Sequence, residues 1–299
     1  MESAVVPDPF ASRRDAIAVI GGGAMGVGIA HAFALAGASV DLIDADLPRA
    51  QAAVSRVEAV LHSAVARGKT SAPDAAAALA RVVPRASIAE VAAGLGLIIE
   101  AVPEILELKR GVLAAAEARE PLVLASNTSG ISIGELGAGL AHPERLIGMH
   151  FFNPVWVMAL LEIVVGEQTS EATLAAARQF GKRIGKETIV VRDLPGFAST
   201  RLGIALGLEA MRMLEDGVAS AADIDRAMEI GYRHPMGPLK LTDLVGLDVR
   251  LDIARNLART YGERYAPPAL LETMVAAGKL GKKSGEGFYR WDERGTSTG

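Results

Sequence analysis

The feature that most constrains the fold is a glycine-rich turn near the start of the chain. Gly21-Gly22-Gly23-Ala24-Met25-Gly26 follows a short apolar run and precedes an alanine-rich stretch of helical composition. This strand–turn–helix context makes a G-x-G-x-x-G match informative. The first glycine permits the turn, the second lets the backbone approach a pyrophosphate, and the third lets helix pack on strand. The sequence therefore predicts a dinucleotide site, with amide donors of the helix N-terminus facing the phosphates.

The surrounding segment, residues 16–40, carries no charged side chain at neutral pH. A hydropathy window would flag such a run as a membrane span. The glycines divide it into a piece of strand length and a helical piece, and a buried strand and helix of an α/β domain give the same hydropathy. We therefore expect no membrane span.

Apolar runs of strand length alternate with helix-like stretches as far as residue 192. The runs are residues 17–20, 39–43, 97–100, 122–125, 146–149, 160–165 and 188–191. Such alternation is typical of βαβ units. It predicts an α/β fold with an N-terminal doubly wound sheet of the Rossmann type.

A change of pattern follows at Asp193-Leu194-Pro195-Gly196, beyond which every segment is helical in character, including one long helix from Pro238 toward Gly262. The 299 residues suffice for two packed domains. We expect a disordered extension over residues 1–15, a dinucleotide-binding domain over 16–192 and a smaller all-helical domain over 193–299. The extension has no apolar core of the kind that a secretory signal requires.

Composition excludes several classes of function. The formal net charge of −4 provides no basic field for nucleic acid or an anionic membrane surface. The chain has no cysteine, so disulfides and thiolate metal sites are impossible. We expect a cytoplasmic protein that uses no metal.

Asp44 ends the second predicted strand, eighteen residues after Gly26. A carboxylate there accepts hydrogen bonds from the adenosine ribose and repels a 2′-phosphate, which favours NAD over NADP. The alternative is an ordinary strand-end or helix-cap residue.

His150 comes just past a predicted strand, and Glu162 lies twelve residues further on, in the next one. An alcohol dehydrogenase needs a base that accepts the hydroxyl proton, and histidine suits this role near neutral pH. A carboxylate on the other ring nitrogen would fix the tautomer. Taken alone, His150 is more often a structural residue, but ligands of doubly wound sheets bind beyond the carboxyl ends of strands. The segment Ser126 to Gly130 also follows a strand, and a simple turn would explain it equally well.

Together these residues resemble the 3-hydroxyacyl-CoA dehydrogenase family, in its compact single-function form. The resemblance runs from Ile17 to Trp291 and is most specific in six stretches. These are Glu100-Ala101-Val102-Pro103-Glu104 with Lys109, Ser126 to Ser129, His150 to Pro154, Pro195-Gly196-Phe197, His234 to Pro238, and Gly281 to Tyr289.

The resemblance implies roles for individual residues. His150 would be the base and Glu162 its partner, with Ser129 and Asn153 near the substrate oxygen and the nicotinamide. The residues that it places around the cofactor are Ala101, Glu104, Lys109 and Lys283, and it places Arg67 near the CoA moiety. For Lys109 and Lys283 the alternative is a solvated surface lysine.

One position departs from the family pattern. Thr200 stands where the family commonly carries an asparagine that contributes to the substrate site, and threonine keeps a hydroxyl donor but has less reach. The resemblance also implies a homodimer formed through the helical domain.

The expected reaction is the reversible oxidation of a (3S)-3-hydroxyacyl-CoA thioester to the 3-oxoacyl-CoA, with hydride passing to NAD⁺ and the proton to His150. Two other functions stay open. One is a dehydrogenase of a hydroxy acid without CoA, as in the related gulonate and carnitine dehydrogenases. The other is a non-catalytic NAD-binding protein, as in the related lens crystallins.

Overall fold

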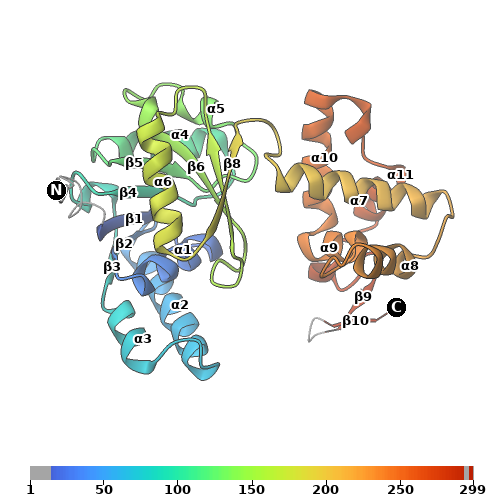
Figure 1. Ribbon diagram of the computed structural model, residues 1–299, viewed down its shortest axis with the longest axis horizontal. Helices are drawn as coiled ribbons and strands as arrows, with labels where there is room; N and C mark the ends of the chain where they lie inside the picture. Colours follow the sequence, from blue (N-terminus) through green and yellow to red (C-terminus); the bar gives the residue numbers. More distant parts are fainter. Residues whose placement is uncertain (1–14, 293–295, 299) are drawn as a thin grey trace, which may run out of the picture. The chain divides into compact units, whose positions relative to one another are not determined.

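The computed structural model describes residues 15–292 and 296–298. The chain divides into two compact units, Met1–Asp193 and Leu194–Gly299 (Figure 1). The predicted N-terminal extension lies outside the described residues, except for Asp15.

The first unit is built on an eight-stranded sheet of order β3-β2-β1-β4-β5-β6-β7-β8. All neighbouring strands run parallel except β6 and β7, which are antiparallel. The strands are β1 (Ala16–Ile20), β2 (Ser39–Ile43), β3 (Val82–Arg85), β4 (Leu97–Glu100), β5 (Val123–Ser126), β6 (Leu146–Phe151), β7 (Leu160–Val165) and β8 (Glu187–Arg192).

All seven predicted runs form strands, and β3 is the strand of this sheet that the sequence pattern does not predict. The reason is Pro84, which lacks a backbone donor and argues against a strand. At the sheet edge, where β3 pairs only with β2, a missing donor is tolerated.

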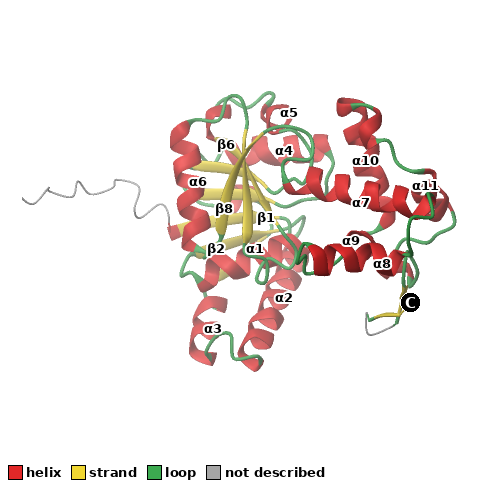
Figure 2. Ribbon diagram, turned by 45° about the vertical axis from the view of Figure 1, so that its right-hand side comes forward, coloured by secondary structure: helices red, strands yellow, loops and turns green. Residues whose placement is uncertain are grey.

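Helices cover both faces of this sheet. Figure 2 shows α6 (Glu171–Arg183) on one face and α4 (Leu106–Glu117) with the short α5 (Ile133–Gly137) on the other. The helix α1 (Ala24–Leu35) packs on the same face as α6, and the rings of Phe33 and Phe180 lie 6.2 Å apart. The helices α2 (Leu47–Ala66) and α3 (Ala72–Leu79) form a pair that projects beyond the sheet. Short 3₁₀ turns occupy Ile88–Glu90 and Pro143–Arg145.

The uncharged segment thus forms β1 and α1, which are largely buried. Among the helices of the described residues, none combines the length and the apolar composition needed to cross a bilayer.

The second unit is mainly helical. Its helices are α7 (Ser199–Glu215), α8 (Ala221–Arg226) with a π-helical extension (Ala227–Gly231), α9 (Pro238–Val245), α10 (Leu247–Tyr261) and α11 (Ala269–Ala276), with 3₁₀ turns at Glu263–Tyr265 and Lys282–Ser284. Their shared core includes Leu208, Leu239 and Leu257. Two-residue strands, β9 (Arg290–Trp291) and β10 (Ser297–Thr298), pair near the C-terminus.

The prediction of one helix from Pro238 toward Gly262 is wrong. The chain turns at Gly246, which has a φ of +104° and separates α9 from α10. Residues with a side chain rarely adopt this conformation. A glycine within a helical pattern is often tolerated, so the pattern alone does not reveal the break.

Candidate active site

The glycine turn lies at the carboxyl end of β1, and two of its glycines are required by the fold itself. Gly21 has a φ of +103°, and a Cβ there would lie 2.7 Å from the carbonyl oxygen of Ala101. A Cβ on Gly26 would lie 1.7 Å from the carbonyl oxygen of Gly21. A Cβ on Gly23, by contrast, would meet no atom of the described residues within 4 Å. The space beside Gly23 therefore fits a group that comes from outside the chain, as a pyrophosphate would.

A cavity of about 760 Å³ adjoins this turn. It lies where β1, β2 and β4 end, and its wall includes Ala24 and Met25 of the first turn of α1, together with Asp44 and Ala101. Leu108 and Val112 of α4 add apolar surface. The volume falls within the range of about 300 to 1,000 Å³ that is usual for small-molecule sites. The cavity therefore suits part of a dinucleotide.

Asp44 connects the second strand to the glycine turn. One carboxylate oxygen accepts a hydrogen bond from the Gly22 amide at 2.9 Å, and the other accepts from the Ala45 amide at 2.7 Å. The cap of α2 is Asp46, whose side chain accepts from the Arg49 amide at 2.8 Å. Asp44 is therefore not a helix cap, and its carboxylate places negative charge in the cavity wall.

His150 and Glu162 form a buried pair. They are direct neighbours across the antiparallel strands β6 and β7. The Nδ1 atom of His150 lies 2.8 Å from Oε2 of Glu162, and both residues are buried. A carboxylate in this position favours a proton on Nδ1 and fixes the ring orientation, so the imidazole exchanges its proton at Nε2.

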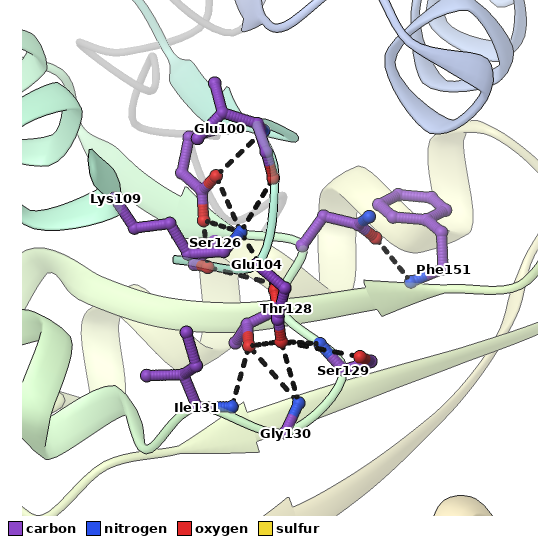
Figure 3. Close-up of polar contacts among 11 residues, drawn as sticks. Glu100, Glu104, Lys109, Ser126, Thr128, Ser129, Gly130, Ile131 and Phe151 are labelled. Carbon is purple, nitrogen blue, oxygen red and sulfur yellow. Dashed lines mark hydrogen bonds and ion pairs between the residues drawn. The ribbon is translucent and has the colours of Figure 1, made fainter. Parts of the chain in front are cut away.

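A second buried network joins the ends of β4 and β5 (Figure 3). Lys109 is only 1% exposed, so it is not a solvated surface lysine. Its Nζ atom lies 2.9 Å from both oxygens of Glu100 and 3.2 Å from Oε2 of Glu104. Ser126 donates a further hydrogen bond to Glu100. One buried ammonium group thus pairs with the fully buried carboxylate of Glu100 and with the more exposed carboxylate of Glu104.

Glu104 organises the turn after β5 (Figure 3). Its Oε1 atom accepts from the Thr128 hydroxyl at 2.5 Å, from the Ser129 amide at 3.0 Å and from the Gly130 amide at 3.2 Å. Burial raises the pKa of Glu104, but the charge of Lys109 and these hydrogen bonds outweigh burial and hold the pKa below its ordinary value. The residue is therefore an anion at neutral pH and fixes the exposed Ser129 at the sheet end.

Asn127 links this turn to the strand of His150. Its side-chain oxygen accepts a hydrogen bond of 2.9 Å from the amide of Phe151, the residue that follows His150. The ring of His150 also lies against Phe152, with 4.5 Å between centroids. The sequence analysis places Asn127 and Glu100 in stretches typical of the family but assigns neither residue a role. The one available signal for Glu100 is a charged residue at the end of a fully buried strand.

The remaining predicted residues lie elsewhere. Asn153 is exposed and follows β6, and Arg67 is an exposed residue at the C-terminal end of α2. Thr200 and Lys283 belong to the second unit. Thr200 is half-buried in the first turn of α7, and the Nζ atom of Lys283 lies 2.5 Å from Oδ2 of Asp248.

The glycine turn yields a testable contrast. Gly23→Ala should weaken dinucleotide binding by at least about tenfold while the unfolding midpoint stays near that of the wild type, because the added methyl occupies only the ligand's space. Gly26→Ala should lower the unfolding midpoint itself. Calorimetric titration and thermal unfolding measure the two effects. Unchanged dinucleotide affinity in Gly23→Ala would contradict the assignment.

Lys109→Met should destabilise the first unit by roughly 3–5 kcal/mol, because it leaves the fully buried Glu100 carboxylate without its cation. Urea unfolding measures the change. Lys69→Met, at an exposed position, is the control and should fall within about 0.5 kcal/mol of the wild type. Equal stability of the two variants would mean that the network holds no net charge interaction.

Comparison with known proteins agrees with this arrangement. Residues 16–194 match the family model of the 3-hydroxyacyl-CoA dehydrogenase NAD binding domain, and residues 196–291 match the model of the C-terminal domain of the same family. A probable 3-hydroxyacyl-CoA dehydrogenase of Caenorhabditis elegans is 39% identical over 285 residues, which are 92% of this chain and 95% of the relative. A probable 3-hydroxybutyryl-CoA dehydrogenase of Bacillus subtilis is 38% identical over 281 residues, which are 93% of this chain and 98% of the relative.

Solved structures give the same result. The crystal structure of (S)-3-hydroxybutyryl-CoA dehydrogenase from Ralstonia eutropha matches with a TM-score of 0.90 and 39% identity, over 94% of this chain and 100% of that one. The dinucleotide of the matched domain is NAD, which the glycine turn and Asp44 fit. The chain belongs to the 3-hydroxyacyl-CoA dehydrogenase family and is an NAD-dependent enzyme of that family.

Proposed function

We propose that this chain catalyses the reversible oxidation of (3S)-3-hydroxyacyl-CoA to 3-oxoacyl-CoA, with His150 as the base. The observation that carries the proposal is the buried hydrogen bond between His150 and Glu162 at the end of the sheet. NAD, when bound, supplies the hydride acceptor. The chain's own residues then have two tasks, which are to bind the substrate and to take its hydroxyl proton.

His150 performs the second task. The hydroxyl proton moves to Nε2 as the carbon–hydrogen bond breaks, and the ring becomes a cation. Glu162 stabilises this cation from Nδ1, and the effect is large because the carboxylate is fully buried. In the reverse direction the same group returns the proton to the 3-oxo oxygen.

Substrate binding involves further residues in this proposal. Ser129, held by Glu104, and Asn153, three residues after His150, would contact the reacting oxygen or the nicotinamide. Arg67 would attract a phosphate of CoA, for which an exposed guanidinium is well suited. Lys283 would lie near the cofactor, and Thr200 would replace the usual asparagine at the substrate. The two relatives described above are named as a 3-hydroxyacyl-CoA dehydrogenase and a 3-hydroxybutyryl-CoA dehydrogenase, which supports a thioester substrate.

A homodimer formed through the helical unit is also part of the proposal. Several large apolar side chains of this unit are exposed: Leu202 and Leu206 on α7, Leu241 and Leu244 on α9, and Val249 on α10. Apolar residues gathered on neighbouring helices are typical of a surface that a partner covers.

The test is a pair of variants with a matched control. His150→Gln should lower kcat by about 10² to 10⁴-fold in the reduction of acetoacetyl-CoA by NADH, because proton transfer loses its base. Glu162→Gln should lower kcat less and change the pH dependence of kcat/KM, because the imidazole keeps its place but loses its carboxylate partner.

The control uses the exposed pair of His142 and Glu144, whose Nδ1 and Oε1 atoms lie 3.2 Å apart. His142→Gln and Glu144→Gln should leave turnover unchanged. Wild-type turnover in His150→Gln would refute the assignment of the base. Turnover of free hydroxy acids in place of thioesters would favour the gulonate- or carnitine-dehydrogenase alternative, and NAD binding without turnover of either would favour the crystallin-like one.

A further inference from the structure

Arg250 of α10 is a buried cation to which the proposed mechanism gives no role. The residue is only 6% exposed. Its Nε atom has no hydrogen-bond partner, and within residues 15–292 and 296–298 no carboxylate pairs with its guanidinium. Asp248, two residues before Arg250 on the helix, binds Lys283 instead. An unpaired buried charge is costly, so the position calls for an anion that the described chain does not supply.

The guanidinium of Arg250 packs directly against helix α7. The guanidinium lies against Gly203 of α7, where a Cβ would be 3.3 Å from Nη1 and 3.9 Å from Nη2. Gly203 is an internal residue of that helix. Glycine is unfavourable inside a helix by about 1 kcal/mol relative to alanine. The missing side chain therefore lets the guanidinium approach the backbone of α7 closely.

Burial lowers the pKa of Arg250 to about 10. The group is still protonated at neutral pH. A guanidinium presents parallel N–H donors that match the two oxygens of a carboxylate. The site can therefore recognise a carboxylate in a fixed orientation.

The position of Gly203 points to the source of the carboxylate. Gly203 follows Thr200 by three residues of α7, so both lie on one side of the helix, about 5–6 Å apart. Thr200 is the residue that the proposed function places at the acyl substrate. A group bound at Thr200 could thus extend along the helix to Arg250.

We infer that Arg250 binds the carboxylate at the far end of a dicarboxylic acyl group, so that the preferred substrates are carboxylated 3-hydroxyacyl-CoA thioesters. The inference rests on the proposed function, since it needs an acyl substrate beside Thr200. A neutral acyl chain would leave the guanidinium without a partner, and a carboxylated chain would pair with it. Arg250 thus determines specificity and takes no part in proton transfer.

The experiment compares two substrates that differ only at the far end, 3-oxoadipyl-CoA and 3-oxohexanoyl-CoA, each reduced with NADH. In the wild type, kcat/KM should be at least about tenfold higher for the carboxylated substrate, the effect of one charge-assisted hydrogen-bonded pair. In Arg250→Met this ratio should fall to about one, through a raised KM for 3-oxoadipyl-CoA. Acetoacetyl-CoA turnover should stay at the wild-type level.

Arg255→Met is the matched control, because Arg255 lies on the same helix and pairs with Glu272 at 2.8 Å on the surface. It should keep the wild-type ratio. Arg250→Lys retains the charge without the planar donors and should keep part of the preference. If Arg250→Met does not fold, the inference is tested by the ratio of kcat/KM for the two substrates in the wild type and in Arg250→Lys.

A wild type that reduces acetoacetyl-CoA with no preference for 3-oxoadipyl-CoA overturns the inference and leaves the proposed function intact. Dissociation of a dimer in Arg250→Met, with the substrate ratio unchanged, overturns it in favour of a carboxylate from a second copy of the chain. A wild type that reduces no thioester refutes the proposed function and this inference with it.

Discussion

The hydrogen bond between His150 and Glu162 depends on the one place where the sheet changes direction. β6 and β7 are antiparallel, whereas every other pair of neighbouring strands in the first unit is parallel. Antiparallel pairing sets the two residues directly opposite each other on one face, although twelve positions separate them in the chain. Because both are buried, the carboxylate acts on the imidazole with little screening by water. The proposed chemistry follows from this register.

Two further contacts hold the backbone beside the His150–Glu162 pair in place. Asn127 ties the end of β5 to Phe151, and Glu104 holds the turn that contains Ser129. Glu104 in turn shares the cation of Lys109 with Glu100, so the arrangement is anchored in the interior. Rigid support of this kind is what keeps reacting groups in their productive geometry. The site is therefore formed by the neighbouring ends of β4, β5, β6 and β7 together with the helix α4.

Much of this could be predicted from the sequence because it depends on local pattern. Gly21 and Gly26 belong to a motif whose spacing predicts that both positions require glycine. The structure confirms this, because a Cβ at either position would collide with a backbone carbonyl group. The burial of Lys109 could not be predicted in this way, because its partners Glu100 and Glu104 come from the preceding strand end and turn. Gly246 resembles any glycine inside a helical pattern, and Pro84 concealed an edge strand. Arg250 was not predicted either, since a charged residue on an amphipathic helix is usually solvated.

As an NAD-dependent dehydrogenase of this family, the chain should act on a 3-hydroxyacyl thioester. The most direct measurement is NADH oxidation by the purified wild-type protein with acetoacetyl-CoA, beside parallel assays with free acetoacetate and with NADPH. We expect rapid turnover of the thioester with NADH, at least about tenfold slower turnover with NADPH because of the Asp44 carboxylate, and little turnover of the free acid. Turnover of the free acid with none of the thioester would contradict this expectation.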